Sequence, residues 1–365
     1  LSLHDALPIS KQRGVKVYHL NIGQPDLPTP QCGLDALKKI DRTVLEYSPS
    51  QGYASYRENL CSYYKEYDIN VTADDIIITT GGSEAVMYAF MACLNPGDEV
   101  ILPEPAYANY MAFAVQVGAK IRTIPTSIED GFALPKVEKF EEMINERTKA
   151  IMICNPNNPT GYVYTQEEMN QIRDLVKKYD LFLFSDEVYR EYIYTNSPFV
   201  SAMNLEGIQE NVILIDSVSK RYSECGIRIG ALITKNETVK KTVMKFCQAR
   251  LSPPLIGQIV AEASLEAPKE YFRGIFDEYL ERRNCLTEGL NKINGVYTPI
   301  PKGAFYTVAK LPVDNAEQFC RWCLEEFNYE GETVMMAPAS GFYTTPGAGI
   351  DQVRMAYVLK CEDLK

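Results

Sequence analysis

The chain has 365 residues, 46% of them hydrophobic and 23% charged, and a formal net charge of −11. This length indicates two packed units, and the composition is that of a globular protein rather than a disordered or fibrous one. The 48 acidic residues outnumber the 37 basic ones, which argues against a nucleic-acid-binding surface but leaves room for a local anion pocket. No stretch reaches the roughly 18 consecutive apolar residues of a membrane span. From the charge and from this absence, we expect neither nucleic acid nor membrane as a partner.

Residues 1–9, LSLHDALPI, are the translation of CTT TCC CTA CAC GAC GCT CTT CCG ATC, a common sequencing-library adaptor. We interpret them as an artefact that is not part of the native fold, and we therefore expect the native start to be missing. The chain also stops at Lys365, soon after a strand pattern, so we expect a C-terminal helix to be lost.

In chain order, short β-rich runs alternate with amphipathic helical runs from about residue 74 to residue 233. This alternation is typical of βαβ units on a mostly parallel sheet, and most of the runs are apolar on both faces, as buried parallel strands are. The expected strands are 75–80, 99–103, 120–125, 149–154, 181–186, 211–216 and 229–234. Helical periodicity occurs between them at 84–94, 107–118 and 165–180.

After Pro268 the pattern changes to a long charged helix over 270–293. A strand at 303–311, a helix near 315–328 and strands near 333–336 and 352–359 follow, which predicts a second, α+β domain. We therefore predict an α/β fold with a large domain over 43–268, in which a mostly parallel seven-stranded sheet lies between helices. A smaller α+β domain covers 269–365, and residues 10–42 form an N-terminal segment that packs with it.

Ten cysteines are scattered along the chain without a disulfide framework, which favours reduced thiols and a cytoplasmic location. Cys320 and Cys323 form a CxxC motif inside a helical pattern, with no second Cys or His pair nearby. Core packing explains this pair better than a metal or redox role, so we predict no metal site.

Polar clusters follow four of the expected strands, at the carboxyl ends where open α/β sheets bind ligands. The first is TTGGSEA at 79–85, where glycines and a helix start favour an anion site, although an ordinary strand-to-helix turn also fits. The second is NPNNPTG at 155–161, an irregular loop that holds Asn158 between Asn157 and Pro159. A plain Pro/Asn turn is the alternative.

The third cluster is SDEVYREY at 185–192, in which Asp186 ends an apolar strand and needs either a functional or a structural partner. The fourth is DSVSKRYSECGIRIG at 216–230, where Lys220 follows a buried strand. A solvated lysine is the alternative there, but hydroxyls flank Lys220, and Arg228 offers a bidentate cation suited to phosphate.

Together these clusters resemble the class I/II aminotransferases of fold type I, the aspartate aminotransferase superfamily. The motifs NPNNPTG, DEVY and SVSK-x5-GIRIG stand in family order, and the resemblance extends from NIGQPDLPTP at 21–30 to QVRMAYV at 352–358. It implies that pyridoxal 5′-phosphate is held by Lys220 as a Schiff base. It also implies ping-pong transfer of an amino group from an L-amino acid to a 2-oxo acid.

The resemblance also implies a role for each matching residue. Lys220 carries the cofactor and moves the substrate proton, Asp186 pairs with the pyridine nitrogen, and Tyr189 with Asn158 contacts the phenolic oxygen of the ring. Tyr107 stacks on the ring. The phosphate is held by Gly82, Ser83, Glu84, Ser217 and Arg228, together with Tyr47 from a neighbouring subunit, which implies a homodimer with shared sites. Ser219 is a further cofactor-binding residue. The substrate carboxylate is bound by Arg354, with Gly23 and Asn158 beside it.

Side-chain specificity is left open by the sequence. Aspartate with 2-oxoglutarate is one hypothesis, in which Arg250 recognises the second carboxylate, although Arg250 does not align with the corresponding family arginine. The segment RYSEC at 221–225 is more polar than the family pattern. A β-lyase that cleaves C–S bonds on the same scaffold is an alternative enzyme. The effector-binding domain of an aminotransferase-like transcription regulator is the non-enzyme alternative, although little chain precedes NIGQPD for a DNA-binding unit.

Overall fold

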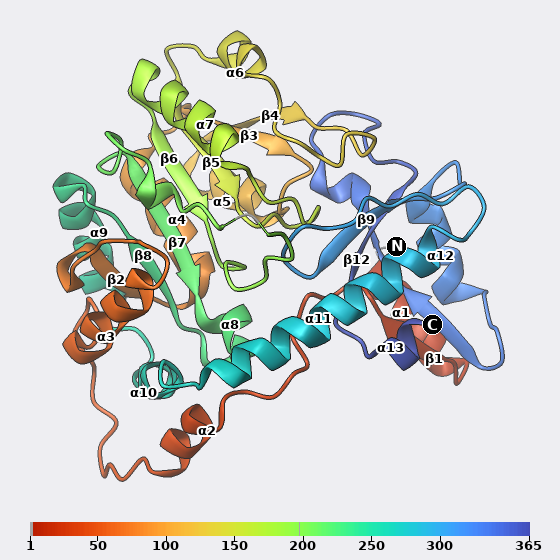
Figure 1. Ribbon diagram of the computed structural model, residues 1–365, viewed down its shortest axis with the longest axis horizontal. Helices are drawn as coiled ribbons and strands as arrows, with labels where there is room; N and C mark the ends of the chain where they lie inside the picture. The colour runs from red at the N-terminus through yellow and green to blue at the C-terminus, as the bar shows by residue number, and fades with distance from the viewer. Residues whose placement is uncertain (1–2, 197) are drawn as a thin grey trace.

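The computed structural model describes residues 3–196 and 198–365. Its largest sheet has seven strands in the order β2-β8-β7-β6-β5-β3-β4 (Figure 1). Their bounds are β2 Ile76–Thr79, β3 Glu99–Glu104, β4 Lys120–Pro125, β5 Thr148–Cys154, β6 Phe182–Asp186, β7 Val212–Ser217 and β8 Gly230–Ile233. Every strand agrees with its predicted range to within one residue at each end, so the predicted seven-stranded α/β architecture is confirmed.

The sheet is mostly parallel, with β8 as the exception. β8 runs antiparallel to both of its neighbours, β2 and β7. Its first residue, Gly230, lies opposite Thr79 on one side and Ser217 on the other. The start of β8 therefore lies at the same edge of the sheet as the carboxyl ends of β2 and β7, which brings the motif at 79–85 and the motif at 216–230 together at that edge.

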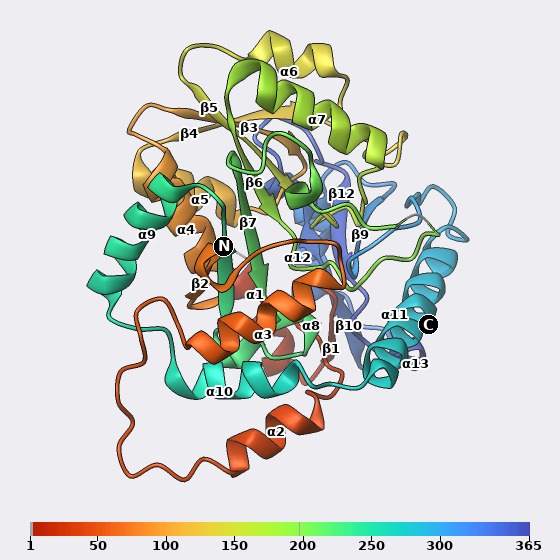
Figure 2. The same ribbon diagram turned by 60° about the vertical axis from the view of Figure 1, so that its left-hand side comes forward.

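Helices cover both faces of this sheet because side chains alternate along the strands, with Ile76 and Ile78 in one buried cluster and Ile77 in the other. One face is covered by α3 Ala54–Lys65, α6 Val137–Met143, α7 Gln166–Tyr179 and α10 Leu255–Ser264. The other is covered by α4 Gly81–Cys93, α5 Asn109–Val117 and α9 Glu237–Arg250, which gather on one side of the strands in Figure 2.

The C-terminal part has its own buried cluster and a three-stranded antiparallel sheet in the order β11-β12-β9. Its elements are α11 Lys269–Leu290, β9 Tyr306–Lys310, α12 Ala316–Glu325, β10 Glu332–Met335, β11 Ala337–Pro338, β12 Gln352–Ala356 and α13 Cys361–Leu364. Short 3-10 turns occur at Ala73–Asp75, Ala202–Asn204, Cys225–Ile227 and Ala339–Phe342. The long helix α11 runs along one side of the molecule, from beside α10 to α13 (Figure 1).

The N-terminal segment contacts both parts of the molecule. Strand β1, Lys16–His19, pairs in parallel with β10, whereas α2, Gln31–Lys38, packs against α10. Helix α1, Leu3–Gln12, includes most of residues 1–9, which we interpret as an artefact, and residues 1–2 lie outside the described residues. The domain boundaries stay predictions.

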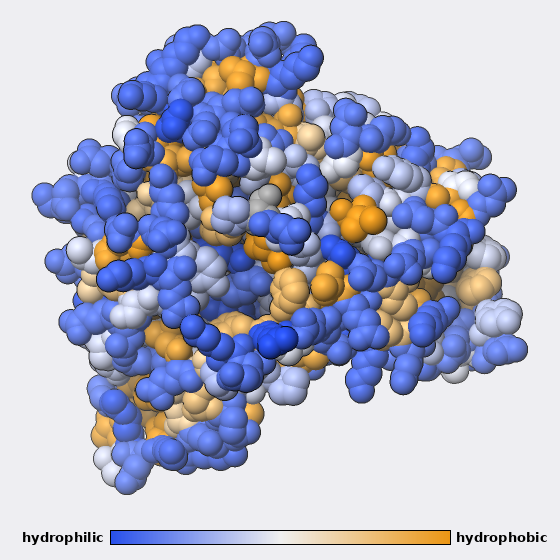
Figure 3. Space-filling view, in the orientation of Figure 1, coloured by the Kyte–Doolittle hydropathy of each residue, from blue (hydrophilic) through white to orange (hydrophobic). Residues whose placement is uncertain are grey.

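Hydrophilic residues cover most of the face drawn in Figure 3, where hydrophobic residues occur in small separate groups. Within residues 3–196 and 198–365, no helix has the length and apolar character needed to cross a membrane. All ten cysteines are free, and Cys320 and Cys323 are buried in α12, where they form part of the core.

Candidate functional site

A cavity of about 460 Å³ opens at the carboxyl edge of the large sheet, against the N-terminal residues 21–24 and the small antiparallel sheet. A larger cavity of about 800 Å³ lies among α2, α3, α10 and α11, but none of the predicted site residues lines it. The first cavity is lined by the predicted residues Gly23, Gly82, Ser83, Tyr107, Asn158, Asp186, Tyr189, Ser217, Ser219, Lys220, Arg228 and Arg354. It is therefore the candidate active site.

Lys220 is presented to this cavity by a single helical turn, α8, Val218–Arg221. Ser217 caps the turn, because its hydroxyl accepts a hydrogen bond from the amide of Ser219 at 3.1 Å. The ammonium of Lys220 donates to the carbonyl of Gly23 at 2.8 Å, and the hydroxyl of Tyr192 donates to the carbonyl of Lys220 at 2.6 Å. Both ends of this lysine are thus held in place.

Asp186 ends β6 at the floor of the cavity and is buried. Its Oδ2 accepts a hydrogen bond from the hydroxyl of Tyr110 at 2.6 Å, and its Oδ1 accepts one from the amide of Val188 at 3.4 Å. Burial raises the pKa of Asp186 to about 6, and the bond from Tyr110 acts in the opposite direction. A carboxylate in this setting attracts a cation or an N–H⁺ group.

A chain of polar contacts crosses the roof of the cavity. Arg354 donates to Oδ1 of Asn158 at 3.4 Å, Nδ2 of Asn158 donates to the hydroxyl of Tyr189 at 3.4 Å, and that hydroxyl bonds to Tyr306 at 3.0 Å. Burial raises the pKa of Tyr189 well above its ordinary value, so its phenol stays protonated at neutral pH. The guanidinium of Arg354 also lies over the rings of Tyr306 and Phe342, 4.9 Å from each centroid, and its Nε has no partner.

The opposite end of the cavity is suited to an anion. There Gly81, with a φ of +74°, starts α4, so that the first amides of a 13-residue helix face the cavity. A Cβ on Gly81 would lie 2.4 Å from NH2 of Arg228 and would displace the end of that side chain, and the positive φ of this residue also favours glycine. Arg228 has a φ of +58° and donates through NH1 to the carbonyl of Cys225 at 2.8 Å.

Three predicted residues do not line the cavity. The carboxylate of Glu84 turns back to the amide of Thr80 at 2.8 Å and to NH1 of Arg250 at 2.6 Å. Arg250 also donates to the carbonyl of Ser50 at 2.9 Å, so within this chain its guanidinium is engaged away from the cavity. Tyr47 is 76% exposed. The predicted roles of Arg250 and Tyr47 therefore depend on a second chain, and that of Glu84 on its backbone amide.

Sequence reasoning missed several residues that line the cavity. Tyr110 lies three residues after Tyr107, and this short spacing is the one signal in the sequence that points to it. Tyr306 comes from β9, and nothing in its surrounding sequence distinguishes it from a core aromatic residue. Cys154, at the end of β5, and Cys225, in the RYSEC segment, also line the cavity.

The chain is similar to known proteins over nearly all of its length. It matches the family described as aminotransferase class I and II over residues 15–352. It is 32% identical to the aspartate aminotransferase of Thermotoga maritima over 97% of this chain and 90% of that protein, and 31% identical to the aspartate/prephenate aminotransferase of Thermus thermophilus over the same shares.

Solved structures agree with this assignment. The crystal structure of the Thermotoga maritima aspartate aminotransferase has a TM-score of 0.90 at 30% identity, covering 99% of this chain and 92% of that one. The aromatic aminotransferase of Pyrococcus horikoshii has a TM-score of 0.88 at 29% identity, covering 100% and 95%. The chain therefore belongs to the class I and II aminotransferases, a family of pyridoxal-phosphate-dependent enzymes, and it is a transaminase.

Proposed function

We propose that this chain binds pyridoxal 5′-phosphate through Lys220 and transfers the amino group of an L-amino acid to a 2-oxo acid by a ping-pong mechanism. The observation that carries the proposal is that Lys220 and Asp186 line one cavity, with an anion-binding helix start at one end and Arg354 at the other. When bound, the cofactor supplies an electron sink that stabilises negative charge at the substrate Cα.

The buried carboxylate of Asp186 fits the pyridine nitrogen of that cofactor. A protonated ring nitrogen would be the cationic partner that the carboxylate of Asp186 lacks. The resulting ion pair would keep the proton on the ring. Tyr110 supports this pairing because its hydrogen bond favours the ionised carboxylate. The chemistry of the ring would therefore depend on Asp186 and Tyr110 together.

The aromatic and amide groups around the ring have distinct roles. Tyr107 would stack on the ring, while Tyr189 and Asn158 would donate hydrogen bonds to its phenolic oxygen. The phenol of Tyr189 can donate because it stays protonated at neutral pH. Its contacts with Asn158 and Tyr306 hold it in the orientation that donation requires.

The phosphate fits the opposite end of the cavity. The amides of Gly82, Ser83 and Glu84 at the start of α4 would bind its oxygens, with the guanidinium of Arg228 alongside them. Ser217 and Ser219 would add hydroxyl donors, because their hydroxyls lie 2.9 Å apart and both residues line the cavity. The absence of side chains at Gly81 and Gly82 leaves room for the phosphate.

The substrate carboxylate would bind to Arg354 as a bidentate ion pair, with Asn158 and the backbone of Gly23 beside it. The unpartnered Nε of Arg354 supports this assignment, because a buried guanidinium N–H without an acceptor is costly and a carboxylate would satisfy it. Lys220 would then move the proton between the substrate Cα and the cofactor. Its contact with the carbonyl of Gly23 holds its nitrogen beside the place where the substrate would lie.

We further propose aspartate with 2-oxoglutarate as the substrates and a cytoplasmic homodimer with shared active sites as the working form. The names of the Thermotoga and Thermus relatives support aspartate as the amino donor, and ten free cysteines support the location. Tyr47, which is 76% exposed, is suited to reach the phosphate in a partner subunit. Arg250 would act across the same interface only if its ion pair with Glu84 opened.

The test is to add single L-amino acids to the cofactor-loaded enzyme and to follow the absorbance change that accompanies amino-group transfer to the cofactor. We expect aspartate to give the fastest change, with the matching 2-oxo acid as the product. Lys220→Ala should abolish both half-reactions. An undiminished rate in Lys220→Ala would refute the proposal, and release of pyruvate with ammonia would instead indicate the β-lyase.

A further inference from the structure

A buried cluster of charges lies beside the strand ends that carry Asp186 and Lys220. It consists of Glu187, Arg190, Glu191, Asp216 and Arg221, and we call it the two-arginine cluster. Glu191, at 8%, is the most exposed of the five side chains. Burying so many charges is expensive unless each is paired with good geometry, so such a cluster is poorly explained as a mere source of stability.

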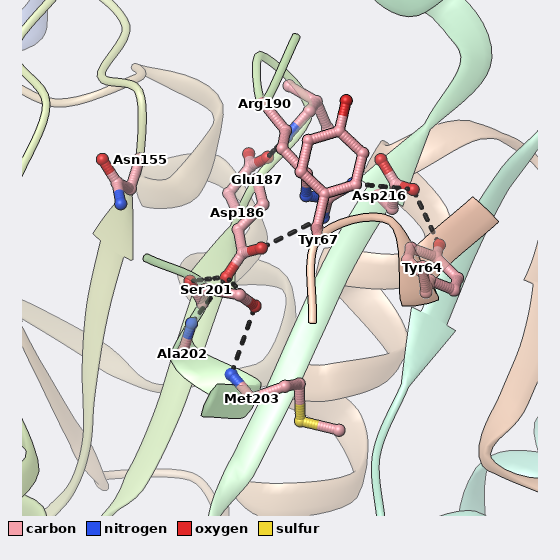
Figure 4. Close-up of polar contacts among 12 residues, drawn as sticks. Tyr64, Tyr67, Asn155, Asp186, Glu187, Arg190, Ser201, Ala202, Met203 and Asp216 are labelled. Carbon is pink, nitrogen blue, oxygen red and sulfur yellow. Dashed lines mark hydrogen bonds and ion pairs between the residues drawn. The ribbon is translucent and has the colours of Figure 1, made fainter. Parts of the chain in front are cut away.

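The first arginine joins the segment after β6 to the end of β7. Arg190 donates to Oε2 of Glu187 at 3.0 Å and to Oδ2 of Asp216 at 3.5 Å. Figure 4 shows Arg190 between these two carboxylates, with Tyr64 on the other side of Asp216, to which its hydroxyl donates at 2.7 Å. Glu187 directly follows Asp186 in the chain, so this contact also anchors the floor of the active site.

The second arginine belongs to the turn that presents Lys220. Arg221 donates through Nε to Oε1 of Glu191 at 2.7 Å and through NH2 to Oδ2 of Asp216. Its guanidinium lies 3.9 Å from the ring centroid of Tyr63. Arg221 and Arg190 together lower the pKa of Asp216 to about 2, against the effect of burial, so this carboxylate stays ionised.

Helix α8 needs such an anchor because it has only four residues, Val218–Arg221, and one isolated helical turn is not stable. We propose that Arg221 is a positioning residue for the transamination: by bonding Asp216 ahead of α8 and Glu191 beyond β6, it fixes the turn so that Lys220 faces Asp186 across the cavity. Arg221 does not line the cavity itself and acts through Lys220. This inference rests on the proposed role of Lys220.

The planar fork of arginine is essential to this assignment. A lysine at position 221 would keep the positive charge, but one ammonium cannot reproduce the fixed geometry with which Nε and NH2 bind two carboxylates. Comparing Arg221→Lys with Arg221→Met therefore separates the need for charge from the need for orientation. Glu191→Gln removes the negative charge from one of the two anchors and leaves Arg221 in place.

The experiment uses the full chain with two readouts. The first is kcat and KM for aspartate in the cofactor-loaded enzyme. The second is the rate at which acetic anhydride labels Lys220 in the cofactor-free protein, measured by peptide mass spectrometry. The matched control is Lys240→Met, because Lys240 also binds two carboxylates, Asp75 at 3.0 Å and Glu237 at 2.7 Å, and does not line the cavity.

We expect Arg221→Lys, Arg221→Met and Glu191→Gln to lower kcat roughly tenfold or more, with KM changed by less than about threefold, because an altered lysine orientation affects chemistry more than binding. Labelling of Lys220 should become several-fold faster, because its contact with Gly23 is no longer held. Lys240→Met should keep the kcat and the labelling rate of the wild type.

Wild-type kcat and labelling rates in the Arg221 and Glu191 variants would overturn the proposal, as would an equal loss of kcat in Lys240→Met. If Arg221→Met does not fold, Arg221→Lys and Glu191→Gln carry the test. If the wild-type enzyme does not transaminate, the proposed function fails. The labelling of Lys220 then still decides whether Arg221 orients it.

Discussion

The hydroxyl of Tyr110 donates a hydrogen bond of 2.6 Å to Oδ2 of Asp186, and no salt bridge joins Asp186 to another side chain among the described residues. Burial raises the pKa of this carboxyl group to about 6, and the bond from Tyr110 limits that rise. Without a bound cation, Asp186 is thus a buried charge with one neutral donor as its main support. Two predictions depend on this relationship.

The first prediction concerns Asp186→Asn. The pKa of Asp186 in the folded state, about 6, lies above its ordinary value of 3.8, so the folded cofactor-free protein loses stability as pH rises from about 4 through 6. The cost at pH 8 is on the order of 2 to 3 kcal/mol. Asp186→Asn removes it, so we expect the cofactor-free variant to be more stable than the wild type near pH 8, and the advantage to vanish near pH 4.

Urea unfolding at both pH values measures this difference in the free energy of unfolding. In the same variant, transamination should fall by roughly a hundredfold or more while the cofactor stays bound, because an amide cannot keep the ring nitrogen protonated. A cofactor-free variant that is less stable than the wild type near pH 8 would contradict the account of Asp186 as an unpaired buried charge.

The second prediction concerns Tyr110→Phe. Loss of the hydroxyl removes a bond that favours the ionised carboxylate, so the pKa of Asp186 should rise above about 6. We expect the dissociation constant of pyridoxal 5′-phosphate to increase several-fold, and more near pH 6 than near pH 8, because fewer molecules then carry the charged carboxylate. Fluorescence titration measures both values. Tyr88→Phe, outside the cavity, is the control, and an equal loss at the two pH values would argue against this role.

Local spacing in the sequence predicts the arrangement of Ser217, Ser219 and Lys220, whereas the assignment of Gly23 and Arg354, which also line the cavity, follows only from the family resemblance. Ser217, Ser219 and Lys220 lie on one strand end and one helical turn, so their joint orientation follows from a short motif. Tyr110 and Asp186 are 76 residues apart, and Tyr189 and Tyr306 are 117 apart. Contacts of this kind depend on how α5 and β9 pack in the folded protein. A local sequence pattern does not predict that packing.

Composition also failed to indicate which charged residues are buried. The segment RYSEC is more polar than the family pattern, yet Arg221 and Glu224 are only 1% and 3% exposed. Both have distant partners: Arg221 bonds Glu191, and Oε1 of Glu224 accepts a hydrogen bond of 2.5 Å from the hydroxyl of Ser264, whereas Oε2 of Glu224 has no partner among the described residues. A sequence does not show whether a charged side chain is solvated by water or paired with another side chain inside the fold. The unusual polarity of RYSEC therefore did not indicate that Arg221 and Glu224 are buried.

The third prediction concerns Arg354→Lys. The guanidinium already donates to Asn158 and to the carbonyl of Asn21, and its unpartnered Nε leaves capacity for a carboxylate. An ammonium cannot satisfy these acceptors and also bind a carboxylate in a bidentate manner, so we expect kcat/KM for both the amino acid and the 2-oxo acid to fall by roughly a hundredfold. The absorbance spectrum of the bound cofactor should stay unchanged. Steady-state kinetics with each substrate provides the measurement, and a loss confined to one substrate would contradict a shared carboxylate site.

The fourth prediction is that the two glycines of the GIRIG segment, Gly226 and Gly230, differ in how well they tolerate substitution by alanine. Gly230 lies between β2 and β7, and a Cβ there would be 2.5 Å from the carbonyl carbon of Gly81 and 2.7 Å from the amide nitrogen of Gly82. Both neighbours are backbone atoms of the phosphate-facing turn, so Gly230→Ala must displace that turn. We expect the dissociation constant of pyridoxal 5′-phosphate to rise roughly tenfold or more, with a loss of about 2 kcal/mol in the free energy of unfolding.

Gly226→Ala is the matched control, because a Cβ on Gly226 would meet nothing within 4 Å. It flanks the same arginine, Arg228, and is the other glycine of the motif, yet we expect cofactor affinity and stability to stay close to those of the wild type. Fluorescence titration of the cofactor and urea unfolding measure both variants side by side. Equal losses in the two would mean that the motif needs glycine for backbone freedom along its whole length. A loss in Gly230→Ala alone would show that the requirement is the close approach of β8 to the turn that begins at Gly81.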